Sequence, residues 1–163
     1  MTQVHLHLLI THLPVFGSIL GALVLGYGVW SKSTSTKMAA YFLFILSSVG
    51  AGIAYLTGEG AEEAVEKLPG VIENIIKTHE EFAMFALISL LLLGVSALVA
   101  LFLSIKNNPL ANTAASFTLF ISLLSFVLVA RTGYLGGQIR HTEITSGAIQ
   151  NNATQEQGEK DDD

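Results

Sequence analysis

The sequence of 163 residues contains no cysteine and only three prolines, and just 13% of its residues are charged. Without cysteine the chain cannot form a disulfide, an iron–sulfur cluster or a thiolate zinc site. The charged fraction is about half of the roughly 25% that is typical of a soluble domain. A net charge of −5 argues against binding to nucleic acid, which requires a basic surface. Apolar sequence is abundant instead, because 51% of the residues are hydrophobic.

Four long apolar runs predict membrane-spanning helices, since a helix of about 20 apolar residues crosses a bilayer. The runs are residues 13–30, 38–57, 82–104 and 110–135. Lipid offers the backbone no hydrogen-bond partners, so each run must be a helix. The short connections 31–37 and 105–109 force neighbouring helices to be antiparallel. The sequence thus predicts an all-α integral membrane protein, with an antiparallel four-helix bundle over residues 1–146 and a disordered acidic tail over residues 147–163.

Charged residues sort to opposite sides of the predicted membrane. The first and third connections carry Lys32, Lys37 and Lys106 and no acidic residue. All 13 acidic residues lie on the other side, between Gly58 and Glu81 or in the C-terminal segment. Short connections that contain lysine stay in the cytoplasm. We therefore expect both termini to lie outside, in the periplasm of a bacterial inner membrane.

The long connection of residues 58–81 contains two short helical patterns. A glutamate and a lysine are spaced four residues apart in each pattern, which stabilises a helix. The dipeptide Pro69-Gly70 separates the two patterns. We expect a short helix over residues 59–68 and a second stretch over residues 71–79 that continues into the third span.

Small residues share one face of the first span. Gly17, Gly21 and Gly28 lie on this face at helical spacing. Small faces in membrane helices are typical of close helix contact. They could alternatively leave room for a porphyrin.

All five histidines lie on the predicted outer side, at the ends of three spans. They are His5, His7 and His12 at the first span, His79 before the third and His141 after the fourth. Imidazole ligates haem iron and metal ions at neutral pH, so the cluster is a candidate coordination site. His12 and His79 lie at similar depth by residue count, which favours them as a pair of haem ligands. His7 and His141 lie further out, where they would ligate a second site; alternatively, all five are interfacial residues that bind nothing.

Arg131 is the charged residue inside a predicted span, where a charge is costly and marks a functional position. Its partner could be a haem propionate, since arginine pairs with carboxylates, or a glutamate at the outer rim. It could instead reach water by extending its side chain. Arg131, Tyr134, Gln138 and His141 form a polar stripe on the fourth span. The dipeptide Gly136-Gly137 within this stripe could cap the helix or allow a flat ligand close to the backbone.

The beginning of the first span resembles a known family. The segment His7-Leu-Leu-Ile-Thr-His12-Leu13-Pro14 is similar to the opening motif His-Pro-x-x-x-His-Phe-Pro of a family of four-span bacterial membrane proteins of unknown function. Leu8 stands in place of the family's proline. His79 before the third span and the glycine-rich end of the fourth fit the same layout. The resemblance implies a small integral membrane protein, and because some members are joined to Rieske iron–sulfur domains it implies redox work.

The sequence favours a haem b-binding membrane electron-transfer subunit, rather than a free-standing enzyme, with its site at the periplasmic face. In this hypothesis His12 and His79 are the axial ligands and Arg131 holds a propionate. Its partners would be membrane lipid and another membrane or periplasmic redox protein, with a quinol as a further candidate. One alternative is a metal-binding protein that holds copper or zinc on His5, His7, His12, His79 and His141. Another is a structural or assembly subunit without a cofactor.

Overall fold

The computed structural model describes residues 2–66, 71 and 73–140, and every regular element among them is a helix. The helices are α1 (Gln3–Ile10), α2 (His12–Trp30), α3 (Thr34–Val65), α4 (Glu73–Ile105) and α5 (Ala111–Arg140). Since α1 and α2 follow one another almost directly, these residues form four helical segments that are long and apolar enough to cross a membrane. The prediction of an all-helical chain with four helices long and apolar enough to span a membrane is confirmed. The predicted tail and His141 lie outside the described residues.

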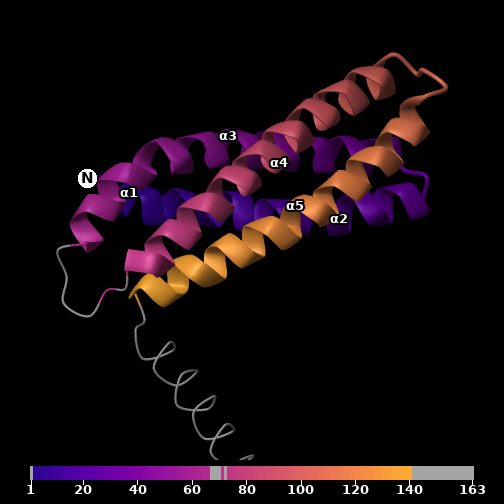
Figure 1. Cartoon of the computed structure of the whole chain (residues 1–163). Helices are drawn as coiled ribbons and strands as arrows, with labels where there is room; N and C mark the ends of the chain where they lie inside the picture. The colour runs from indigo at the N-terminus through magenta and orange to yellow at the C-terminus, as the bar shows by residue number, and fades with distance from the viewer. Residues whose placement is uncertain (1, 67–70, 72, 141–163) are drawn as a thin grey trace, which may run out of the picture.

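The helices lie side by side along most of their length (Figure 1). In this view the connection between α2 and α3 and the connection between α4 and α5 lie at the same end of the molecule. The N-terminus lies at the other end, together with the beginning of α4 and the last turn of α5. The histidines of α1 and α4 therefore belong to one end, and the lysines of the short connections belong to the other.

Two helices extend well beyond the apolar runs of the sequence. α3 has 32 residues, which at 1.5 Å per residue is about 48 Å, whereas the hydrocarbon core of a bilayer is about 30 Å thick. The charged segment from Glu59 to Val65 therefore projects past the apolar segment 38–57. We expected a separate short helix over residues 59–68, and this prediction is wrong. The residues up to Val65 instead continue α3, because no proline interrupts the helix there. The second stretch does continue into the third span, since α4 begins at Glu73.

A break at Thr11 separates α1 from α2. Pro14 has no N–H to donate to the carbonyl of Ile10, so the helix loses one hydrogen bond at this point. At the same point of the chain, the Thr11 hydroxyl donates a hydrogen bond to the Leu8 carbonyl at 3.1 Å. α1 contains no buried residue, yet it packs along α3. Thr11 keeps helical backbone angles, so α1 continues into α2 as one span.

Small residues allow α2 to pack closely on α3. The three contacts are Gly17 with Ser47, Gly21 with the Phe44 ring, and Gly28 with Lys37. A Cβ atom at any of these glycines would overlap its neighbour or press closely against it. All three glycines are buried, which confirms the interpretation of this face as a helix contact.

The interior combines a few large side chains with many hydroxyl groups. Tyr41, Phe44, Leu90 and Leu93 are fully buried. Buried serines mostly donate to carbonyls of their own helix, but the Ser125 hydroxyl crosses from α5 to the Ser89 carbonyl on α4 at 3.1 Å. The outer faces carry exposed leucine, valine and phenylalanine side chains along the helices. This distribution suits a protein whose outer surface contacts lipid.

Candidate functional site

His7 on α1 lies half-buried against α3. Its Nδ1 is 2.9 Å from the Ala54 carbonyl oxygen and 3.4 Å from the Thr57 hydroxyl. Because a carbonyl can only accept, Nδ1 carries the proton and donates it to Ala54. In the neutral ring Nε2 then keeps a free lone pair. Gly58 faces this ring, and a Cβ there would lie 3.7 Å from Cε1, which is ordinary contact.

His79 on α4 lies half-buried against α5 in a similar way. Its Nδ1 donates to the Thr132 carbonyl at 3.0 Å, so its Nε2 is also left unprotonated in the neutral ring. Gly136 lies beneath the ring, and a Cβ at this position would be 3.1 Å from Cε1 and 3.4 Å from Nδ1. The missing side chain of Gly136 therefore lets the imidazole approach the backbone of α5.

The two histidines are held by the same backbone arrangement on different helices. In an α-helix the carbonyl of residue i accepts from the N–H of residue i+4, so the Ala54 carbonyl pairs with Gly58 and the Thr132 carbonyl with Gly136. A glycine at i+4 has no side chain to shield the carbonyl, which can accept a second hydrogen bond from the ring. Burial lowers the pKa of His79, and the His7 imidazole acts in the same direction. The structure thus places two imidazoles of fixed tautomer at one end of the helices.

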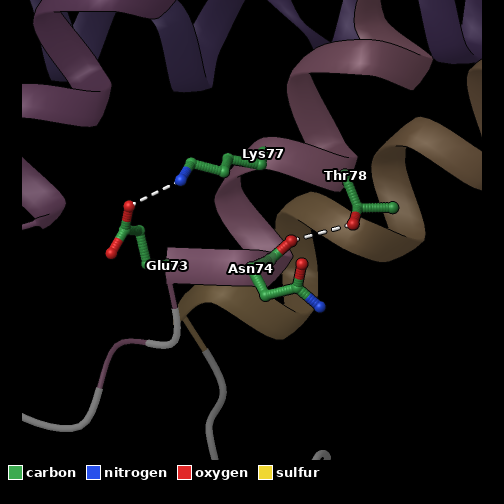
Figure 2. A network of polar contacts seen from close by, with 4 residues as sticks. All are labelled: Glu73, Asn74, Lys77 and Thr78. Atoms are coloured by element: carbon green, nitrogen blue, oxygen red, sulfur yellow. Dashed lines mark hydrogen bonds and ion pairs between the residues drawn. The ribbon is translucent and has the colours of Figure 1, made fainter.

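Polar contacts stabilise the first turns of α4, which precede His79 (Figure 2). Lys77 forms an ion pair with Glu73 at 2.7 Å, which confirms the interaction predicted from their spacing. The Thr78 hydroxyl donates to the Asn74 carbonyl at 2.8 Å. The ion pair lowers the pKa of Glu73 and raises that of Lys77, through their hydrogen bond and charge attraction. These contacts stabilise the helical turn that precedes the histidine.

Two carboxyl groups face one another near His79. Glu62, beyond the apolar segment of α3, interacts with Glu80 of α4, and the Glu80 carboxyl, together with partial burial, raises the pKa of Glu62 to about 7. At neutral pH the pair therefore retains part of a proton. The sequence pattern gave no indication of this pair, because its members lie on different helices. Among the described residues no group of three or more histidine and carboxylate side chains is arranged to hold a metal ion.

His12 and His5 lie outside the contact between helices. His12 is exposed on α2, where its Nδ1 donates to the Leu8 carbonyl of the preceding turn at 2.7 Å and its ring stacks on Phe16. His5 is also exposed and contacts Thr2. The structure therefore brings His7, rather than the predicted His12, into contact with a neighbouring helix.

Arg131 is exposed on α5 and lies between two aromatic rings. Its guanidinium carbon is 5.5 Å from the centre of the Phe82 ring and 5.6 Å from that of Tyr134. The Gln138 amide donates to the Tyr134 hydroxyl at 3.2 Å, so the predicted stripe is continuous over these residues and lies on the outside. No carboxylate in the described ranges is within 4.0 Å of Arg131. The adjacent Gly136-Gly137 does not cap the helix, because α5 continues to Arg140.

Comparison of the chain with protein-family models, curated proteins and solved structures finds no match. The resemblance of the first span to a four-span bacterial family therefore stays a prediction.

Proposed function

We propose that the protein is a haem b-binding membrane electron-transfer subunit in which His7 and His79 would hold the haem iron. One observation supports this above all others: both rings donate Nδ1–H to a backbone carbonyl of a neighbouring helix and leave Nε2 free. Histidines that ligate metals commonly donate their other ring N–H to a carbonyl or carboxylate, which fixes the tautomer and orientation. His7 replaces the His12 of the sequence prediction, because His12 lies on the exposed face of α2.

Haem ligated by two imidazoles supplies one-electron redox chemistry when bound. The chain contributes the orientation of the two rings through the Ala54 and Thr132 carbonyls. Arg131 has no carboxylate partner among the described residues, so its guanidinium is available for a propionate. A site at one end of the helices does not carry electrons across the membrane. We therefore expect a membrane or periplasmic redox protein as partner, with a quinol as the other candidate donor.

We further propose that the helices form an antiparallel bundle in a bacterial inner membrane, with both termini in the periplasm. The pairing of Gly17 with Ser47 and of Gly28 with Lys37 supports opposite directions for α2 and α3. The exposed Lys32 and Lys106 of the short connections support a cytoplasmic location for that end. On this arrangement the two histidines face the periplasm.

A copper or zinc site on the same two Nε2 atoms is the second candidate function. Its support is the two free Nε2 atoms, and among the described residues no third histidine or carboxylate side chain is arranged with them to hold a metal ion. The two candidates differ in what the purified protein contains. Haem gives a visible spectrum, whereas a zinc or copper ion is found by elemental analysis.

The test is a reduced-minus-oxidised visible spectrum of the protein purified in mild detergent from cells supplied with a haem precursor. We expect a b-type band in the wild type and its loss in His7→Ala and in His79→Ala. His12→Ala is the matched control and should keep the band, because this exposed ring contacts Leu8 and Phe16 of the same span. Circular dichroism should show that all three variants stay helical.

Three results would overturn the haem proposal. They are a colourless wild type, a band that survives both His7→Ala and His79→Ala, and a band that depends on His12 as strongly as on His7. A colourless protein with stoichiometric zinc or copper would support the second candidate. A protein with neither haem nor metal would leave the role of a structural or assembly subunit.

A further inference from the structure

A lysine is buried at the end of the molecule opposite His7 and His79. The sequence places Lys37 in the first connection, but the structure places it in the first turn of α3 with only 5% of its surface exposed. Gly28 of α2 packs against its backbone. Its Nζ donates to the Asn112 side-chain oxygen at the beginning of α5, at 2.7 Å. Burying an ammonium group is costly unless it is paired with a negative charge.

No such charge is supplied by the described part of the chain. An ammonium group has three N–H donors, and Asn112 accepts one of them. No carboxylate among the described residues lies within 4.0 Å of Nζ. The glutamates of α3 and α4, from Glu59 to Glu81, belong to the other end of the helices. The positive charge of Lys37 is therefore not neutralised by any carboxylate of the described residues.

A small cavity of about 170 Å³ opens beside this lysine. Its polar lining comes from α3, α4, α5 and the connection between the last two: Thr34, Lys37, Ser104, Asn107, Asn108 and Asn112. The lining offers ammonium, amide and hydroxyl donors and contains no acidic side chain. A donor-rich cavity with one positive charge fits an oxyanion.

We propose that this cavity binds a phosphate group, with Lys37 as the charged ligand and Asn112 as its positioning partner. The cavity lies next to the beginning of the apolar segment of α3, at the level where a membrane-spanning helix meets the lipid headgroups. A phosphate there could belong to an anionic phospholipid or be free in solution. Both sources present the same oxygens to the lysine.

The test measures binding by native mass spectrometry of the detergent-solubilised full chain. The probes are short-chain phosphatidylglycerol, phosphatidylcholine and, as the free anion, inorganic phosphate. Preferential binding of phosphatidylglycerol alone identifies a lipid headgroup, whereas binding of inorganic phosphate as well identifies the phosphate group itself as sufficient. Absence of binding by both phosphatidylglycerol and inorganic phosphate would overturn the proposal.

Three variants distinguish the site from general attraction to a basic surface. Asn112→Asp gives Lys37 a carboxylate of its own and should weaken phosphate binding about tenfold or more, in line with the loss of a charged hydrogen bond. Lys37→Met keeps the volume, removes the charge and should weaken binding similarly. Lys106→Met, at an exposed lysine of the same end, should leave the affinity within about twofold. If Lys37→Met does not fold, Asn112→Asp alone decides, and unchanged binding in it would refute the site.

Discussion

The variant Gly136→Ala should change two contributions to stability: the helix propensity of position 136 and the contact between this position and the His79 ring. Gly→Ala normally stabilises a helix by about 1 kcal/mol. At position 136, however, the new Cβ would lie 3.1 Å from Cε1 of His79, so the ring must retreat by a few tenths of an ångström. The Nδ1–Thr132 hydrogen bond, now 3.0 Å, would lengthen to about 3.3–3.5 Å, where such a bond is weak.

The expected stability change in Gly136→Ala is therefore close to zero. The gain in helix propensity is offset by the loss of one hydrogen bond, which is worth about 1 kcal/mol. Gly137→Ala is the matched control, since nothing lies within 4 Å of its Cβ position, and it should keep the full gain. The two variants should differ by roughly 2–4 °C in Tm.

Thermal unfolding in detergent, followed by circular dichroism, measures this difference. Nitrogen NMR of the labelled histidine side chains reports whether Nδ1 of His79 still carries the proton. In a His79→Ala background the two glycine substitutions should become equivalent, because the ring that distinguishes them is gone. Equal Tm gains for Gly136→Ala and Gly137→Ala with His79 intact would refute the contact.

Two further predictions concern packing and pH. Gly21→Leu should destabilise the protein by at least about 1–3 kcal/mol, because even a Cβ at this position would overlap the Phe44 ring. The control Gly26→Leu faces open space and should be nearly neutral. Equal denaturation midpoints of the two variants in mixed micelles would contradict this prediction. The pKa of Glu62 is raised from 4.5 to about 7 in the folded state. Between these pH values the folded state binds more protons than the unfolded state. The free energy of unfolding should therefore fall as the pH rises through this window. Tm recorded from pH 5 to 8 measures the decline, and Glu80→Gln should flatten it; an unchanged slope in that variant would show that the carboxyl pair is not its cause.

Much of the fold follows from local sequence patterns. Helix number, helix type and the approximate ends depend on apolar runs of membrane length, and these need no knowledge of tertiary contacts. The glycine face of α2 was also predictable, since Gly17, Gly21 and Gly28 repeat at helical spacing. The end of α3 was harder to predict, because charged residues beyond the bilayer remain helical where nothing breaks the hydrogen-bond pattern.

The candidate site was predictable only in part. Counting residues gives the depth of a histidine along its helix, and on that basis His12 matches His79. It does not say which side of the helix meets a neighbour, and the structure turns His7 toward α3 while His12 stays exposed. The burial of Lys37 escaped prediction for a related reason, since it depends on Asn112, 75 residues away in the sequence.

The backbone acceptors of His7 and His79 have a consequence for how this protein can change during evolution. A side-chain acceptor disappears when its residue is replaced, but every residue type retains a carbonyl. Substitutions at Thr132, which is only partly buried, can therefore accumulate without loss of the hydrogen bond that orients His79. Selection would act on position 136 instead, where any side chain displaces the ring. Among descendants of a common ancestor, the histidine and the glycine should thus persist together while the residue that supplies the acceptor drifts.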